Sequence, residues 1–463
     1  MIQRLRQYGS TFLVAALSGA FGAVLVQGTS VLTTLIAGDS ISERASVQVA
    51  LGLVSLVFFG IAIFVGGLVT TNTVSTVIAG RTRELALFRL IGSSAARLRT
   101  QIAVDGLVVG CVGAVAGTVL GSAAAAGSVA IGVATGAIPD VVYGLVTPTL
   151  AAPIVAVALV TWLAAWVGSR RVLDVTPIQA AAASVEPTRE QTRQRPLRNG
   201  SAFALIGIGV LLLAAGVVLG LVSMLGVLVG MLGGILSFTG IVLAAPLFMP
   251  PLLRGVGRLL GRSPAARIAA ANAVRHPERS ARTTIGLVIG VTLVTMFAVA
   301  AQNYYDFIQR SREAYPADYG DSDQILALTI GVFAVLFGFS ALIAAVGMVN
   351  NLSLSVLQRR RELGLLRALG FTKVQVRAMI LAESVQMTVA AVGFGLVLGI
   401  VYGWAGSQAL LGSILGGGFA LPSVPWLVLG AAAIAAAVLA ASASIAPAQR
   451  ATRISPVSAL AVD

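Results

Sequence analysis

The stretch that decides the fold is RRRELGLLRALG, residues 359–370. A related stretch, TRELALFRLIG, occupies residues 82–92, in register at an offset of 278 positions. The identical pairs at this offset are Arg83 and Arg361, Glu84 and Glu362, Leu85 and Leu363, Leu87 and Leu365, Arg89 and Arg367, Gly92 and Gly370, and Arg99 and Arg377. A fixed offset held by seven pairs indicates an internal duplication.

Each copy has the pattern of a short amphipathic helix. A glutamate lies in the predicted first turn, an arginine in the last, and a glycine follows that can take the left-handed conformation which ends a helix. Apolar residues recur every three positions, namely Leu85, Phe88 and Ile91 in the first copy and Leu363, Leu366 and Leu369 in the second. Long apolar runs flank both copies, so we expect each helix to lie at a membrane surface rather than cross it.

The composition is that of an integral membrane protein. The chain has 463 residues, of which 57% are hydrophobic and only 10% charged, and its mean hydropathy is +0.95. Soluble domains carry about 25% charged residues. One cysteine, Cys111, and one histidine, His276, exclude an internal disulfide and a metal site built from these residues.

Runs of about 20 apolar residues predict an all-α protein with ten membrane-spanning helices. We place these helices at residues 12–36, 49–78, 102–131, 149–168, 201–222, 224–250, 284–303, 324–352, 377–411 and 425–447. The least certain boundary lies between the fifth and sixth, where Leu221 to Leu225 offers few turn residues. Losing one helix there would put the two copies on opposite sides of the membrane.

Arginines support the ten-helix topology. With this topology nearly all of them fall on one side of the membrane, and only Arg44, Arg310 and Arg312 fall on the other. The positive-inside rule therefore predicts that both termini and both copies face the cytoplasm. The predicted units are a first half at 1–180, a linker at 181–200, an inserted helix pair at 201–250, a basic segment at 251–283 and a second half at 284–463.

The doubled pattern R-E-x-x-L-x-R-x-x-G between spanning helices resembles the coupling segment of permeases of MacB/FtsX-type ABC transporters. The resemblance covers roughly residues 49–177 and 275–456. It implies a bacterial cell-membrane permease that docks two copies of a separate ATPase through Arg83, Glu84, Arg89, Gly92, Arg361, Glu362, Arg367 and Gly370. The ATPase would bind ATP and Mg²⁺, because this chain has a single lysine, Lys373, and no phosphate-binding loop around it.

This sequence departs from many ten-helix relatives because its predicted external segments are too short to form a large domain. A charged face on lipid headgroups is the alternative interpretation of the two copies. Headgroup anchoring needs positive charge, however, and has no use for Glu84 and Glu362. We therefore favour docking, with no catalytic residue in this chain.

Two further pairs of polar residues keep the 278 offset. Asp105 and Glu383 could form a proton relay, or could pair with an arginine of the coupling segment and brace it as a hinge. Asn72 and Asn350 could hold neighbouring helices together or contribute to a substrate path. For both pairs the structural interpretation is favoured.

The few charges within the spans favour a hydrophobic or amphipathic substrate over a polar one. We expect such a substrate to enter sideways between the first two helices of one half and the seventh and eighth helices of the other. The candidate cleft residues are Gln27, Gln302 and Asn303 at the outer mouth and Gly66 and Gly338 on the second and eighth helices, where bulky side chains should block export. Two other functions stay open: a signalling module that controls an external cell-wall enzyme or a sensor kinase, and a proton-driven transporter.

Overall fold

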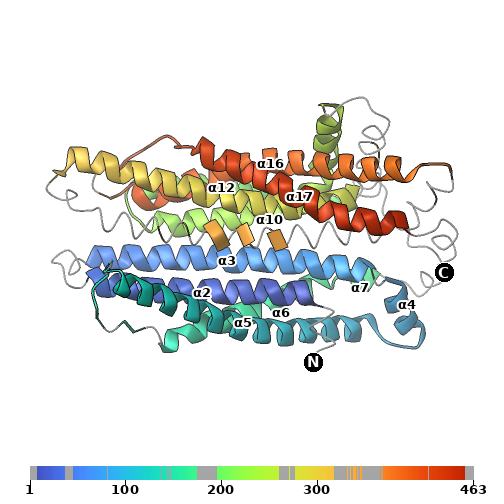
Figure 1. The fold of residues 1–463 in the computed structure, drawn as a ribbon, viewed down its shortest axis with the longest axis horizontal. Coiled ribbons are helices and arrows are strands. Elements are labelled where there is room, and N and C mark those ends of the chain that lie inside the picture. The colour runs from blue at the N-terminus through green and yellow to red at the C-terminus, as the bar shows by residue number, and fades with distance from the viewer. Residues whose placement is uncertain are drawn as a thin grey trace.

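The computed structural model describes residues 8–36, 45–80, 82–136, 138–141, 143–144, 147–174, 196–259, 271, 277–316, 369–414 and 417–453, with isolated positions between 331 and 365. In this part of the chain every regular element is a helix (Figure 1). The elements are α2 (Gly9–Ile36), α3 (Ala45–Gly80), α4 (Thr82–Leu90), α5 (Ala95–Ala134), η1 (Pro148–Leu150), α6 (Ala151–Gly168), α7 (Arg171–Asp174), α9 (Pro196–Gly220), α10 (Gly226–Leu259), α12 (Pro277–Ala314), α16 (Lys373–Leu411) and α17 (Trp426–Arg453).

The predicted class, an all-α multi-pass membrane protein, is confirmed. Within the described residues eight helices are long and apolar enough to cross a membrane, and a shorter apolar stretch, Trp426–Leu439, lies in α17. The predicted eighth span, residues 324–352, falls almost wholly outside the described residues. Several helices are longer than predicted; α5, for example, begins at Ala95 instead of residue 102 and therefore includes Arg97 and Arg99.

The duplication is visible in the arrangement of the helices. α5 begins at Ala95 and α16 at Lys373, which preserves the 278 offset of the sequence. In the first half α5 packs along α2 and α6, and in the second half α16 packs along α12 and α17 in the same way. The two halves form two layers, with α2, α3, α5 and α6 on one side and α12, α16 and α17 on the other (Figure 1).

Glycines allow the closest helix contacts in both halves. A Cβ added at Gly117 or Gly121 of α5 would collide with the backbone of Ala16 or Ala20 in α2. A Cβ added at Gly399 of α16 would collide with the Thr295 side chain of α12. Van der Waals packing between small residues is what holds helices together in lipid, so these glycines are packing positions.

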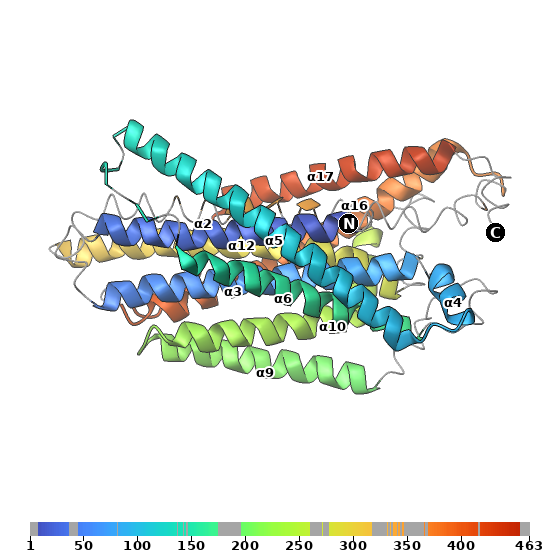
Figure 2. The ribbon, with the colours of Figure 1, turned by 90° about the horizontal axis from the view of Figure 1, so that it is seen from below.

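The inserted helices α9 and α10 form a separate hairpin that packs mainly on the second half (Figure 2). They are joined by a turn in which the Leu225 N–H donates a hydrogen bond to the Ser223 side-chain oxygen at 3.3 Å. The fifth and sixth predicted helices are therefore two separate helices, because α9 ends at Gly220 and α10 begins at Gly226. α9 begins at Pro196, inside the predicted linker. α10 continues to Leu259 and α12 begins at Pro277, so both ends of the predicted basic segment are also helical.

Aromatic side chains fill the interface between the halves. Phe21 of α2 contacts Phe339 with ring centroids 4.9 Å apart, and Phe58 of α3 contacts Phe297 of α12 at 5.4 Å. α10 lies beside α3 as well as α12 and α16, and its Phe238 contacts Phe64 of α3 at 6.3 Å. The inserted pair is therefore part of this interface and does more than cover its outside.

Candidate functional site

The duplicated stretch forms a sharp elbow between a spanning helix and the next one. α4 lies across one end of the bundle, after α3 and before α5 (Figures 1 and 2). Gly92 follows α4 with φ +99°, and Gly370 has φ +97° at the equivalent place. The predicted left-handed glycine is therefore confirmed in both copies. Glycine can take this positive φ without steric strain, because it has no Cβ.

Two residues that the sequence analysis did not single out, Ser94 and Thr372, cap the helices that follow the elbows. Ser94 caps α5 by accepting a hydrogen bond from the Arg97 N–H at 3.2 Å. Thr372 caps α16 and accepts a hydrogen bond from the Gln375 N–H at 3.2 Å, with the Gln375 side chain returning to the Thr372 N–H. Ser94 and Thr372 also keep the 278 offset, so a hydroxyl two residues after each glycine was the available signal.

α4 leaves part of its apolar face uncovered by the rest of the bundle. Leu85 and Ala86 are buried, and Leu85 packs in a cluster with Leu98 of α5 and Val172 of α7. Phe88 is 43% exposed, and Ile91, which lies beyond the last residue of α4, is 82% exposed. Of the predicted stripe, Leu85 is therefore covered by neighbouring helices, whereas Phe88 and Ile91 extend beyond them, because the chain turns at Gly92.

The polar residues of α4 are accessible from outside the bundle. Glu84 is exposed in the first turn and Arg89 is half-buried in the last, as predicted for a helix of this polarity. The exposed apolar residues beside them are Leu87, Phe88 and Leu90. In the second copy Leu365 and Leu369 are exposed, whereas Arg361, Glu362 and Arg367, like the Arg83 side chain, lie outside the described residues.

Arg99 connects the elbow to α6. Its Nε and one terminal nitrogen donate hydrogen bonds to the Trp166 carbonyl oxygen at 3.3 and 3.2 Å, and the guanidinium lies 3.8 Å from the Trp166 ring centroid. Cation–π contact adds to the hydrogen bonds. Asp105 is half-buried and Glu383 is buried, in equivalent positions of α5 and α16. Whether these acids brace the elbow stays a prediction.

The candidate polar residues of the outer mouth are engaged with neighbouring helices. Gln27 is buried between α2 and α5 and donates a hydrogen bond to the Ser122 hydroxyl at 3.0 Å. Gln302 donates to Asp306 one turn along α12 at 2.9 Å. Asn303 donates to the Ser407 hydroxyl of α16 and accepts from the Ser423 N–H, both at 2.8 Å. These contacts hold helices and a loop together, so a substrate would have to replace them.

The described residues beside the expected lateral passage are packed against neighbouring helices, whereas most of the eighth helix, which would form one of its walls, lies outside the described residues. A Cβ at Gly66 would lie 2.8 Å from the Ser18 hydroxyl, so Gly66 packs within the first half and does not face the second. A Cβ at Gly338 meets no described atom within 4 Å. Asn72 is half-buried on α3, and Asn350 lies outside the described residues. Between α3 and α12 the space is occupied by α10 and by the Phe58–Phe297 pair, which the linear order of helices could not reveal.

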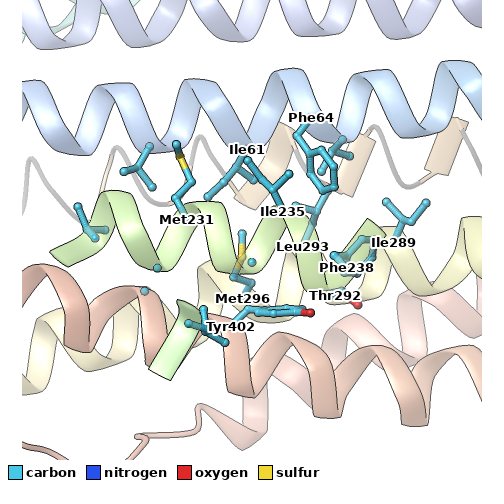
Figure 3. Close-up of a pocket in the computed structure, with 17 residues that line it drawn as sticks. Ile61, Phe64, Met231, Ile235, Phe238, Ile289, Thr292, Leu293, Met296 and Tyr402 are labelled. Atoms are coloured by element: carbon cyan, nitrogen blue, oxygen red, sulfur yellow. The ribbon is translucent and has the colours of Figure 1, made fainter. Parts of the chain in front are cut away.

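An apolar cavity of about 100 Å³ remains where α3, α10, α12 and α16 meet (Figure 3). Ile61 and Phe64 reach it from α3, Ile235 from α10 and Met296 from α12. The Tyr402 and Ser237 hydroxyls are hydrogen-bonded to each other across α16 and α10 at 2.9 Å. The sequence prediction missed this site because α10 belongs to the inserted pair, which carries no repeated motif.

The fold and the elbows define a membrane protein built from two equivalent halves, and in the first of them a helix, α4, lies across one end of the bundle. A family profile described as the FtsX-like permease C-terminal region matches residues 56–177 and again 334–456. The two matches begin 278 residues apart and together cover more than half of the chain. The chain belongs to the FtsX-like permease family.

Individual relatives match shorter parts of the chain. It is similar to the uncharacterized ABC transporter permease YknZ of Bacillus subtilis (strain 168), with 31% identity over 149 residues, 32% of this chain and 34% of that protein. It is also similar to the uncharacterized ABC transporter permease MJ1507 of Methanocaldococcus jannaschii, with 36% identity over 77 residues, 17% of this chain and 18% of that protein. The matched regions thus span about a third and about a fifth of these relatives.

Proposed function

We propose that this chain is the membrane-spanning subunit of an ABC transporter whose ATPase is a separate protein. The observation that carries the proposal is the pair of equivalent elbows, each ending in a glycine with φ near +100° and each followed by a capped spanning helix. Two elbows in one chain give two docking positions, one for each copy of the ATPase. Both relatives are named as ABC transporter permeases, which is consistent with this function.

The docking surface that we propose is the exposed part of α4 and its second copy. It combines a carboxylate, Glu84, with exposed apolar side chains, Phe88 and Leu90 among them. Apolar residues surrounded by charge are typical of a protein interface, whereas a headgroup anchor would need only basic residues. ATP-driven closure of the two ATPase subunits would push on both elbows and move the halves relative to each other.

The test reverses the charge at both docking positions, Glu84→Arg with Glu362→Arg. We expect the co-expressed ATPase to dissociate or its stimulated ATP turnover to fall to the basal rate, because positive charge would replace the carboxylate that we propose the partner contacts. Glu313→Arg is the matched control, since Glu313 is exposed at the opposite end of the bundle on α12. Unchanged co-purification and unchanged stimulated turnover in the double variant would overturn the docking assignment.

We propose a hydrophobic or amphipathic substrate, because the described interface between the halves presents aromatic and aliphatic side chains. A polar solute would need compensating polar groups along its path. The signalling alternative predicts a different partner. Isolation of a stoichiometric cell-wall hydrolase or sensor kinase with this chain, in place of transport activity, would favour that alternative.

A further inference from the structure

A second cavity adjoins the cavity between the halves. The two have volumes of about 100 and about 90 Å³ and share six lining residues, which come from α3, α10, α12 and α16. These shared residues are Val57, Ile61, Val227, Met296, Tyr402 and Gly406. The two cavities therefore adjoin each other at these six residues, and we call them together the interface cavity.

The lining of the interface cavity is suited to hydrocarbon and poorly suited to water. Thr292 and Tyr402 carry the only polar side-chain atoms among the 17 residues of its first part (Figure 3). The Tyr402 hydroxyl is already bonded to Ser237 at 2.9 Å. A buried water needs two to four polar partners, and apolar cavities without them stay dry.

Its position corresponds to one leaflet of a bilayer. On α3 the lining runs from Val54 to Val65, which is about 16 Å at the helical rise per residue. That is roughly half of the 30 Å hydrocarbon core. In the candidate span Gly52–Ser75 of α3, these residues occupy most of the half that is nearer the helix start and farther from α4. We therefore place the interface cavity in the leaflet distant from the elbows.

The two walls of the interface cavity come from different parts of the fold. α3 of the first half forms one wall, and α10, α12 and α16 form most of the other. α10 is fixed to the second half by the Ser237–Tyr402 hydrogen bond and by a hydrogen bond from the Gln386 side chain to the Leu253 carbonyl. Toward α3 its contacts include the Met231 side chain, whose sulfur would lie 3.1 Å from a Cβ at Gly60. Methionine is flexible and adapts to a changing neighbour, so the α3–α10 contact is the side on which the cavity can open.

We propose that the interface cavity binds the acyl chain of a lipid-like substrate, which enters between α3 and α10. The assignment of this ligand as substrate rests on the proposed transport function, whereas the binding itself does not. α10 then serves as the substrate-facing wall that the inserted pair adds to the duplicated fold. The halves would admit or release the chain as α3 moves relative to α10.

The experiment measures labelling of the purified permease, without its ATPase, by a phosphatidylglycerol that carries a photoreactive diazirine at the end of one acyl chain. Modified peptides are mapped by mass spectrometry. We expect labelling at Met231 and Met296, which line the cavity from α10 and α12. Competition with an excess of unlabelled lipid should remove this labelling while leaving the non-specific labelling of the outer surface.

Two variants fill the cavity and one serves as the matched control. Gly234 and Gly406 line it, and a Cβ at either position meets no atom within 4 Å. The Cβ of Gly234→Leu or Gly406→Leu therefore fits, and the rest of the leucine side chain would occupy the cavity. We expect labelling to fall by about tenfold, the lower end of what blocked methylenes cost in an apolar pocket. Gly393→Leu, on the exposed face of α16, should label as the wild type does.

The outcomes separate this inference from the proposed function. Labelling that stays the same in both filled variants, or wild-type labelling that unlabelled lipid does not compete away, overturns the acyl-chain site. The competition test uses the wild type alone and so does not depend on the folding of any variant. Competed labelling of the cavity with no effect of Glu84→Arg and Glu362→Arg on ATP turnover would overturn the docking proposal and keep the site.

Discussion

At the scale of single residues, the two elbow glycines matter for their backbone conformation and not for space. Gly92 and Gly370 have φ of +99° and +97°, yet a Cβ at either position meets no described atom within 4 Å. An L-residue in this conformation is strained by about 1–2 kcal/mol. The repeat therefore retains glycine because of a turn that no other residue makes at equal energy.

We predict that Gly92→Ala lowers the stability of the elbow by about 1–2 kcal/mol, and that Gly370→Ala does the same. The apparent melting temperature of the purified protein should fall by a few degrees. Gly127→Ala is the control, because Gly127 is exposed within helix α5, has open space around it and gains from the higher helix propensity of alanine. Equal melting temperatures for Gly92→Ala and Gly127→Ala would contradict the strain argument.

At the scale of helices, matched glycines set the distance between the two principal partners of each half. Gly117 and Gly121 of α5 and Gly395 and Gly399 of α16 keep the 278 offset and all face the neighbouring helix, α2 or α12. Helix pairs in lipid gain stability from close packing rather than from the hydrophobic effect. Equivalent glycines thus allow the same close helix contact in both halves, between α5 and α2 and between α16 and α12.

Valine at either contact should separate the helices. We expect Gly117→Val and Gly399→Val each to destabilise the protein by about 1–3 kcal/mol, as overpacking does, because the Cβ would collide with Ala16 or Thr295. The measurement is the yield of monodisperse protein together with its melting temperature. Gly393→Val, with open space on the same helix as Gly399, should match the wild type; a similar loss there would show that valine itself is not tolerated in α16.

At the scale of the whole molecule, the elbows lie at one end of the bundle and the α9–α10 turn lies at the other (Figure 2). Positive-inside charge predicts that the elbow end is cytoplasmic. Two positions of nearly equal exposure test this orientation. Ile91 beside α4 is 82% exposed and Val222 in the α9–α10 turn is 84% exposed.

In a Cys111→Ala background, Val222→Cys should react with a membrane-impermeant maleimide added to intact cells. Ile91→Cys should react only after the cells are opened. Ile91 and Val222 are equally exposed in the isolated chain. Reaction of Ile91→Cys in opened cells would show that this site can be labelled, so its failure to react in intact cells would report the side of the membrane. The reverse pattern would place the elbows outside, where no ATPase could reach them, and would remove the basis of the transport proposal.

Local signals in the sequence were enough to predict the class, the duplication and the elbows. Hydrophobic runs of spanning length, the 278 offset and a glycine after each amphipathic stretch are local signals, and each depends on a few neighbouring residues. The prediction of a left-handed glycine at both Gly92 and Gly370 holds for that reason. The break between α9 and α10 was also a local feature, although a weak one, with a single serine and glycine to mark it.

Which helix packs against each side chain could be learned from the tertiary structure alone. Phe88 and Ile91 share the spacing of Leu85 but are exposed, because coverage of α4 depends on α5 and α7 and not on its own periodicity. Gly66 packs on Ser18 within its own half, and α10 occupies the gap between α3 and α12 where we expected an open passage. In a chain that is apolar on nearly every face, hydrophobicity cannot distinguish lipid from protein, so helix neighbours are decided by close packing between distant segments.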